Sequence, residues 1–240
     1  MVTLKQVRAR LRGHADPQHA IYHKAYHKSS LDFYGLRAPQ LHAAFRDLFP
    51  AKQQMDREDA LKLVGELRST GWAEEGSIAT MLLARIQPQL TAADVPYLSD
   101  WCDRCNGWGE IDTVCLEVIG PLALRLGTPV YRQVRAWSKA EHMWTRRAAI
   151  LVHIIPARRY QLSAEYSWPT FEELLYEREF FIRKAIGWTL RECSKNYPEL
   201  VADFLLRVGD SASGLTRREG GRNLPEELRA RVLPGYATKI

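Results

Sequence analysis

A large aromatic residue opens a similar helical segment at four places in the chain. Trp72, Trp108, Trp144 and Phe181 follow one another at intervals of 36, 36 and 37 residues, and each interval has room for two helices and a short turn. Self-similarity at this period is typical of solenoids, in which stacked helical hairpins bury their apolar faces against their neighbours. The spacing therefore predicts an all-α fold of stacked antiparallel helix pairs.

Hydrophobic periodicity supports this prediction. Apolar residues recur at three- and four-residue spacing along most of the chain, proline and glycine separate the helical segments, and no two-residue alternation indicates a strand. Residues 157–170 are the one stretch that we predict to be a long loop. Because nothing in the sequence marks a boundary, we expect residues 1–240 to form a single curved domain with a concave face.

Charge gives the first indication of function. The chain has 34 Lys and Arg residues against 28 Asp and Glu, a formal net charge of +6. Residues 125–159 contain eight basic residues and a single acid, Glu141. An arginine-rich block suits a polyanion, because a guanidinium can bind two phosphate oxygens at once. The alternative is a solvated helix surface. We expect the concave face to be basic.

Other features of the sequence bear on the compartment. No apolar run reaches the roughly 18–20 residues of a membrane span. The first residues, MVTLKQVRARLRGH, are basic but lack the apolar segment of a secretory signal. Four cysteines without such a signal indicate a reducing compartment and no disulfide framework. The sequence therefore predicts a cytoplasmic protein.

Metal-binding patterns are present but incomplete. Cys102 and Cys105 form a C-x-x-C pair without a second pair at zinc-finger spacing. His19, His23 and His27 would share one face of a helix, but no Glu stands between them as it does in the H-E-x-x-H motif. A metal-dependent enzyme that uses these histidines is one alternative, although the interpretation that we favour includes no metal and no cofactor.

One carboxylate and two indoles stand out against the repeat. Asp112 is the only acid, and Trp188 the only aromatic residue, at their equivalent positions in the four repeats. Such departures from a local pattern often mark function. Trp108 lies four residues before Asp112, so a helix would place both on one face. A lone carboxylate beside indoles and cations suits a reaction that develops positive charge on a sugar, whereas each residue by itself could equally be structural.

Five segments, in order and at matching spacing, resemble the DNA alkylation repair enzyme family, the AlkD-type DNA glycosylases built from HEAT-like repeats. The resemblance runs from about Ala25 to about Leu228 and is strongest in EFFIRKAIGWTLRECSKNYPELV, residues 179–201. The remaining segments are residues 25–39, 108–112, 143–151 and 215–219. The resemblance implies an all-α, HEAT-like solenoid that acts on duplex DNA as a monomer without a cofactor.

The resemblance also implies a catalytic role for three residues. Trp108 and Asp112 match the Trp-x-x-x-Asp pair of the family's catalytic centre, and Trp188 matches its second tryptophan. The two indoles would lie against the deoxyribose of the damaged nucleotide, and Asp112 would stabilise the sugar cation and hold the attacking water. Gly107 and Gly109 depart from the family pattern, and we expect them to loosen the start of this helix.

A second set of residues is expected to bind the DNA rather than to react with it. By the same resemblance, Arg147, Lys184 and Arg191 would contact phosphates near the lesion, and Tyr26 would complete the DNA-binding surface.

The reaction that the resemblance implies is base excision. The enzyme would hydrolyse the N-glycosidic bond of cationic N3- or N7-alkylated purines and leave an abasic site, without turning the base into a pocket. The alternative from another class is a non-catalytic helical-repeat protein that binds DNA or a protein partner on the same face. Asp112 favours the enzyme, because a simple DNA binder does not need a carboxylate that faces phosphates.

Overall fold

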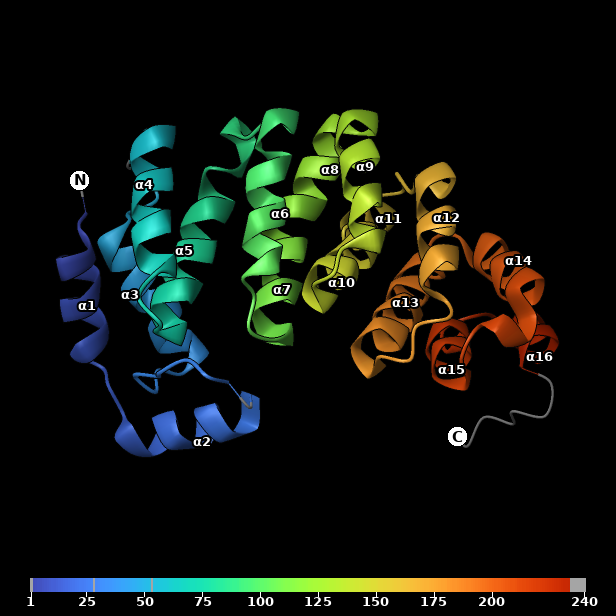
Figure 1. The fold of residues 1–240 in the computed structure, drawn as a ribbon, viewed down its shortest axis with the longest axis horizontal. Coiled ribbons are helices and arrows are strands. Elements are labelled where there is room, and N and C mark those ends of the chain that lie inside the picture. The colour runs from blue at the N-terminus through green and yellow to red at the C-terminus, as the bar shows by residue number, and fades with distance from the viewer. Residues whose placement is uncertain (1, 28, 53, 234–240) are drawn as a thin grey trace. The chain divides into compact units, whose positions relative to one another are not determined.

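The computed structural model describes residues 2–27, 29–52 and 54–233, and over these residues the chain is all-helical apart from one isolated β-bridge between Asp32 and Trp72 (Figure 1). The all-α prediction is thereby confirmed. Contacts within the chain gather into two compact units that meet between Leu90 and Thr91. A single domain over residues 1–240 stays a prediction, and the two units are described separately.

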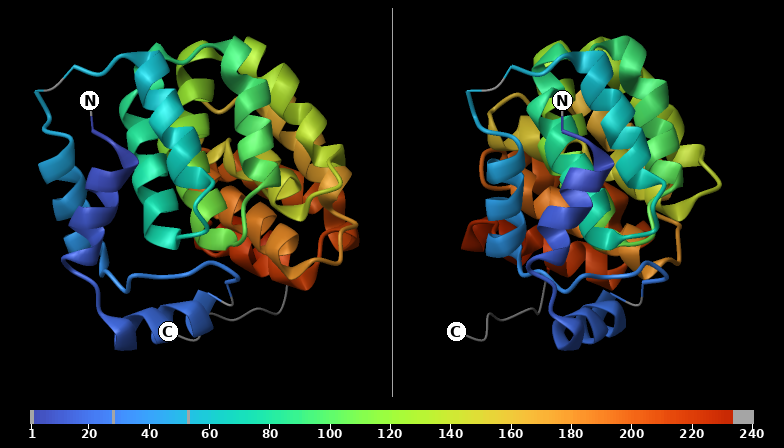
Figure 2. Two further views of the ribbon diagram at one scale, coloured as in Figure 1. Left: turned by 60° about the vertical axis from the view of Figure 1, so that its left-hand side comes forward. Right: turned by 90° about the vertical axis from the view of Figure 1, so that its left-hand side faces the viewer.

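The first unit is built around the helix that follows Trp72. Its helices are α1 (Leu4–Arg12), α2 (Pro17–His27), α3 (Ala38–Leu48), α4 (Arg57–Arg68) and α5 (Ala73–Arg85), followed by a 3-10 turn, Gln87–Gln89. Helix α5 contacts α1, α3 and α4 (Figure 2). The apolar side chains that fill the space between these helices include Val7, Leu11, Leu63, Leu67, Ile78, Leu82 and Leu83.

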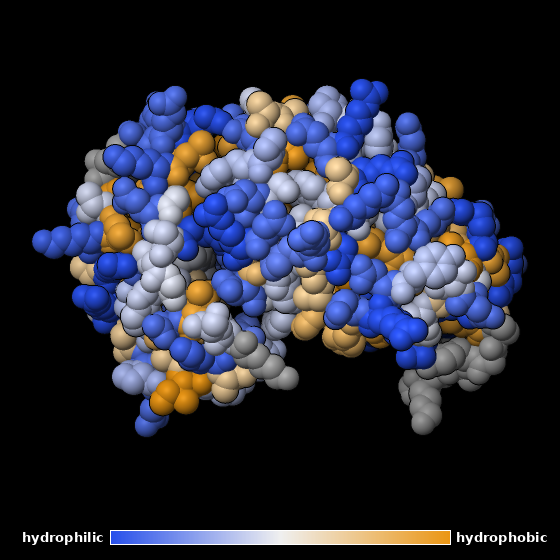
Figure 3. All heavy atoms as spheres, in the orientation of Figure 1, coloured by the Kyte–Doolittle hydropathy of each residue, from blue (hydrophilic) through white to orange (hydrophobic). Residues whose placement is uncertain are grey.

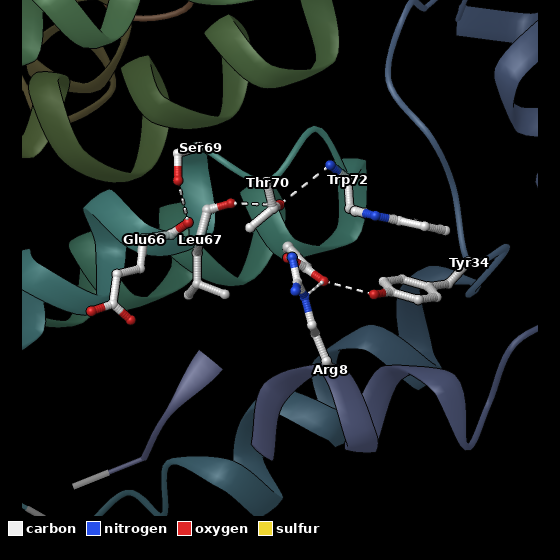
Figure 4. A network of polar contacts seen from close by, with 8 residues as sticks. Arg8, Tyr34, Glu66, Leu67, Ser69, Thr70 and Trp72 are labelled. Carbon is white, nitrogen blue, oxygen red and sulfur yellow. Dashed lines mark hydrogen bonds and ion pairs between the residues drawn. The ribbon is translucent and has the colours of Figure 1, made fainter. Parts of the chain in front are cut away.

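Two buried glutamates at the start of α5 fix the segment that follows α2. The Glu74 carboxylate accepts hydrogen bonds from the backbone N–H groups of residues 34–36, at 2.8 to 3.1 Å. The Glu75 carboxylate accepts from Arg8 Nε at 3.0 Å and from the Tyr34 hydroxyl at 2.6 Å (Figure 4). Carboxylates are favourable at a helix N-terminus, and these hydrogen bonds offset the cost of burying them.

Helix α2 is held at its N-terminal end and buries none of its own residues. Asp16 caps it by accepting from the backbone N–H groups of Gln18 and His19. Gly35 crosses close to this end with φ of 88°, and a Cβ there would stand 2.1 Å from the Asp16 carbonyl oxygen. Only glycine fits both this approach and this backbone conformation. Helix α2 therefore stands out from the core and leaves the Tyr26 side chain exposed.

The second unit contains the longer run of repeats. Its α-helices are α6 (Val95–Asp103), α7 (Trp108–Val114), α8 (Gly120–Leu126), α9 (Thr128–Arg135), α10 (Met143–Leu151), α11 (Ile154–Arg158), α12 (Ala164–Leu174), α13 (Phe180–Cys193), α14 (Pro198–Val208), α15 (Gly214–Gly221) and α16 (Glu226–Val232). A π-helix, Cys115–Ile119, joins α7 to α8, and the 3-10 turns are Ala92–Asp94, Ala136–Lys139 and Gly209–Ser211.

These helices pack in two layers. One layer contains α6, α9 and α12, in which each helix contacts the next, and the other contains α7, α10, α13 and α15 in the same manner (Figure 1). Prolines stand at the first or second position of α6, α9 and α14, where the missing N–H has no helical partner to lose. Hydrophilic side chains cover most of the face drawn in Figure 3, as expected when amphipathic helices bury their apolar sides.

The prediction of a long loop over residues 157–170 is wrong. Helix α11 ends at Arg158 and α12 begins at Ala164, so the connection is residues 159–163. Pro169, whose local signal favours a helix break, lies inside α12. Phe171 and Leu174 of this helix are buried, and Trp168 packs on Phe204 with ring centroids 4.9 Å apart. Tertiary packing therefore outweighs the backbone hydrogen bond that the proline removes.

A buried histidine in this unit makes stability depend on pH. His153 is 2% exposed, stacks on Tyr131 and shares a hydrogen bond with Ser167, and burial lowers the pKa of its imidazole from 6.5 to about 3. The unfolded chain binds a proton there below about pH 6.5, whereas the folded chain does not. This group therefore leaves the free energy of unfolding at its highest value above pH 6.5. As the pH falls to about 5, the group lowers that free energy by about 2 kcal/mol.

His153→Phe keeps an aromatic ring at this position, and the Ser167 hydroxyl keeps its hydrogen bond to the Ser163 carbonyl oxygen. We expect the variant to lose less stability than the wild type between pH 6.5 and 5 in denaturant titrations. His42→Gln, which removes an exposed histidine, should follow the wild type. Equal pH dependence in wild type and His153→Phe would contradict the assignment.

Candidate active site

Helix α7 begins at the tryptophan expected to be catalytic. Gly107 is its extended N-cap residue, with φ of −177°, and Trp108 is the first residue of the helix. The Glu110 side chain accepts from the backbone N–H of Asn106 at 3.1 Å, which secures the entry to the helix. The helix thus starts in place despite the two glycines, and Trp108 and Asp112 lie one turn apart on one face.

Asp112 is paired with Arg147 across two helices. Arg147 Nε donates to Asp112 Oδ1 at 2.8 Å, and Arg147 Nη2 donates to Oδ2 at 3.0 Å. The third nitrogen, Nη1, donates to the carbonyl oxygen of Phe181 at the start of α13. Such a two-point contact between a guanidinium and a carboxylate is strong and directional. One arginine therefore ties together α7, α10 and α13.

The two partners differ in exposure. Arg147 is 3% exposed, whereas the Asp112 side chain keeps 16% of its surface accessible. The cation is thus the inner member of the pair, and the carboxylate is its outer member. The phosphate contact expected of Arg147 stays a prediction, and in this geometry its donors are directed at Asp112 and Phe181.

Trp188 lies on the side of α13 that faces away from the core. At 100° per residue, Lys184, Trp188 and Arg191 fall within about 60° of one another on this helix. All three side chains are half-buried, whereas the opposite side carries buried apolar residues such as Ile186 and Leu190. The predicted indole and the two predicted phosphate ligands therefore share one surface.

A glutamate that the sequence did not single out joins the two cations of this surface. Glu219 of α15 accepts from Lys184 Nζ at 2.5 Å and from Arg191 Nη1. Burial raises the pKa of the Glu219 carboxyl, but the hydrogen bond from Lys184 and the charges of Arg191 and Lys184 outweigh it, so the pKa lies below its usual value. Glu219 is ionised at neutral pH and holds both cations beside Trp188.

Close helix packing sets the position of Trp188 itself. Gly187 lies against α15, where a Cβ would stand 2.6 Å from the Glu219 Cβ and 3.2 Å from the Thr216 carbonyl oxygen. Gly220 of α15 in turn lies against Leu190, whose Cβ would stand 3.0 Å from a Cβ at that position. The two glycines let α13 and α15 approach each other at the level of Trp188.

The remaining predicted residue belongs to the first unit. Tyr26 is 58% exposed on α2, stacks on Tyr22 at a centroid distance of 6.1 Å and meets His27 edge-on at 5.0 Å. Over residues 2–27, 29–52 and 54–233, no group of three or more His, Cys, Asp or Glu side chains is placed to hold a metal ion. His19, His23 and His27 instead form a row of ring contacts along α2.

Comparisons with known proteins identify the family. The family model described as DNA alkylation repair enzyme matches residues 7–224. The chain belongs to the DNA alkylation repair enzyme family. It is similar to a solved structure, a predicted DNA alkylation repair enzyme from Enterococcus faecalis, with 22% sequence identity and a TM-score of 0.79. The match covers 88% of this chain and 97% of that chain. Among curated proteins there is no match.

These findings support a role in DNA repair, with DNA as the partner. No helix in the described part of the chain is long and apolar enough to cross a membrane.

Two parts of this site were not predicted from the sequence. Glu219 lies in the LTRRE segment that carries part of the resemblance, but its charge alone does not reveal the cations that it joins. The Phe181 carbonyl oxygen is a backbone acceptor that no sequence pattern marks. The spacing of charged residues in the sequence could nevertheless have indicated these contacts, because Asp112 and Arg147 are 35 residues apart, as are Lys184 and Glu219. Opposite charges about one repeat apart can face each other on neighbouring helices.

The close approach of α13 and α15 gives a stability prediction. Gly187→Ala should lower the free energy of unfolding by about 1–3 kcal/mol, because the new methyl group pushes α13 away from the Thr216 backbone and the Glu219 side chain of α15. Gly65→Ala is the matched control, since this exposed glycine inside α4 has no atom within 4 Å of its ideal Cβ. The control should gain up to about 1 kcal/mol in the same urea titration. An unchanged free energy of unfolding in Gly187→Ala would contradict this prediction, because it would show that α13 and α15 can move apart without loss of stability.

Proposed function

We propose that this protein is a DNA glycosylase of base excision repair, which hydrolyses the N-glycosidic bond of cationic N3- or N7-alkylated purines in duplex DNA. The observation that carries the proposal is the Asp112 carboxylate, held at two points by the buried Arg147, one turn from Trp108, in a chain of the DNA alkylation repair enzyme family. No cofactor takes part, and the protein acts as a monomer.

The chemistry of the substrate explains why one acid suffices. Alkylation at N3 or N7 gives the purine a positive charge and weakens its bond to the sugar. When that bond breaks, its electron pair neutralises the base, so no general acid is needed to protonate the leaving group. The positive charge passes to the sugar as an oxocarbenium ion, and water adds to its C1′ and releases a proton. The products are an abasic site and the free base.

Asp112 has two tasks in this scheme. Its negative charge stabilises the developing sugar cation, and an oxygen lone pair left free by Arg147 holds the attacking water. A carboxylate about 4 Å from a unit positive charge contributes roughly 4 kcal/mol at an effective dielectric constant near 20. That is about three orders of magnitude in rate, an upper value because the sugar charge is partial.

The aromatic and basic residues bind the nucleotide. Trp108 and Trp188 place their electron-rich faces against the deoxyribose, where they favour the cationic sugar. Lys184 and Arg191, fixed by Glu219, grip phosphates near the lesion, and Tyr26 of the first unit also contacts DNA. The half-buried Trp188 is part of a helix surface rather than of a deep pocket, which supports catalysis without base flipping.

Release of free base from alkylated duplex DNA tests the proposal. The wild type should release 7-methylguanine or 3-methyladenine, and Asp112→Asn should be slower by about 10²–10³-fold. Asp100→Asn, which removes an exposed carboxylate paired with Arg104, should retain the wild-type rate. A wild type that binds DNA but releases no base would establish the non-catalytic alternative.

A double-mutant cycle tests whether Arg147 acts through Asp112. Arg147→Gln should slow base release at least about tenfold, whereas in the Asp112→Asn background the same change should add nothing. Arg147→Gln in that background should also leave the salt dependence of binding to undamaged DNA unchanged. Additive losses of rate, or a salt slope that falls by about 0.9, would instead assign a phosphate contact to Arg147.

A further inference from the structure

A second group of charges lies beyond Trp188, at the C-terminal end of α13. Glu192 is 4% exposed, and its Oε2 accepts from Arg158 Nε and from Lys195 Nζ, both at 2.8 Å. The Arg158 and Lys195 side chains keep 41% and 50% of their surface accessible. The carboxylate is therefore buried beneath two cations that remain available to a ligand.

This group lies on the same side of the helix as the candidate active site. At 100° per residue, Glu192 of α13 falls about 40° from the direction of Trp188, and Lys195 lies in the turn that follows the helix. With a rise of 1.5 Å per residue, Glu192 is about 6 Å along the helix axis from Trp188. A DNA strand carries one phosphate per 3.4 Å of its axis, so this distance corresponds to about two nucleotides.

The arrangement repeats that of the cations on the other side of Trp188. There Glu219 joins Lys184 to Arg191, and here Glu192 joins Lys195 to Arg158. In each group one carboxylate fixes a lysine and an arginine, which leaves a net charge of +1. Cations that are already ordered lose less conformational freedom when they bind a phosphate.

The connection that follows Arg158 is itself fixed to the residues that follow α13. Asn196 Nδ2 donates to the Ala157 carbonyl oxygen at 2.8 Å, and the Leu162 N–H donates to the Tyr197 hydroxyl at 3.2 Å. Between these contacts Tyr160 adopts φ of 57°, in the left-handed region that bulky residues rarely occupy. A strained turn persists only where its surroundings determine it, so Arg158 is held in place against Glu192.

We propose that Arg158 and Lys195, tethered by Glu192, form a second phosphate-binding site, which takes the backbone of the DNA strand that passes Trp188 along α13. The proposal rests on the proposed function insofar as DNA is the ligand. The neighbouring Arg159 is exposed and forms no ion pair within the described residues, which adds positive charge at this end of the surface.

The salt dependence of binding to undamaged duplex DNA provides the test, measured by fluorescence anisotropy at several salt concentrations. Arg158→Gln/Glu192→Gln/Lys195→Gln removes the three charges together, so that no buried charge is left without a partner. We expect the slope of log Kd against log salt to fall by about 1–2, because each phosphate that the protein no longer neutralises lowers it by about 0.9.

The matched control removes the same charges elsewhere in the second unit. Arg104→Gln/Asp100→Asn/Arg207→Gln also takes away two cations and one acid, from the exposed ion pairs Asp100–Arg104 at the end of α6 and Glu172–Arg207 between α12 and α14. Its slope should stay within about 0.3 of the wild type, since these residues lie outside the proposed phosphate site. Should the first variant not fold, Lys195→Gln keeps the Arg158–Glu192 pair, and its slope should fall by about 0.9.

A slope that is unchanged, or that falls no further than in the control, overturns this site. That outcome is separate from failure of the proposed function, which is judged by release of base from alkylated DNA by the wild type. Because the binding measurements use undamaged DNA, they decide the phosphate site whether or not base is released.

Discussion

The pairing of Arg147 with Asp112 is the constraint on which the arrangement of the candidate active site depends. A guanidinium that is 3% exposed must have all its donors directed at acceptors, because an unpaired buried charge costs several kcal/mol. Asp112 supplies two acceptors and the Phe181 carbonyl oxygen supplies a third. The helices that carry these groups therefore cannot slide along one another without breaking the set. The register of α7, α10 and α13 is fixed by a single side chain.

This constraint has a consequence for the chemistry. A carboxylate bound at two points cannot turn, so its remaining lone pairs keep one direction while a substrate approaches. Preorganised charge of this kind stabilises a transition state without having to reorganise when the reaction occurs. The arginine also neutralises part of the field of the carboxylate, so the benefit is greatest for a substrate that is itself cationic. A lone, oriented acid is thus better matched to an alkylated purine nucleoside than to a neutral one.

The sequence predicted much of the fold because the repeat gives the same information several times. The aromatic residues Trp108, Trp144 and Phe181 all fall at the first or second position of a helix. The connection after α11 was predicted to be too long because Pro169 favours a helix break. The packing of Trp168 on Phe204 keeps this segment helical, and it joins residues far apart in the chain. Local propensity cannot report such contacts.

The candidate site was predictable in its residues but not in their connections. The resemblance named Asp112 and Arg147, yet as catalytic acid and phosphate ligand rather than as a pair. The stacking of the repeats decides which charges meet. Residues 34 or 35 apart form three ion pairs: Asp112 with Arg147, Lys184 with Glu219, and Arg158 with Glu192. The separation is close to the period of the lead aromatic residues.

The common spacing of these ion pairs follows from the architecture. A helix of one repeat meets the equivalent helix of the next, so residues about one period apart are neighbours in space. Opposite charges at that separation pair, and when one partner is buried the pair fixes the direction of the other. In Asp112–Arg147 the cation is buried and the acid keeps the larger accessible surface, whereas around Glu192 and Glu219 the acid is less exposed than the cations that it binds. The same stacking rule therefore produces both a directed carboxylate and a surface of ordered cations.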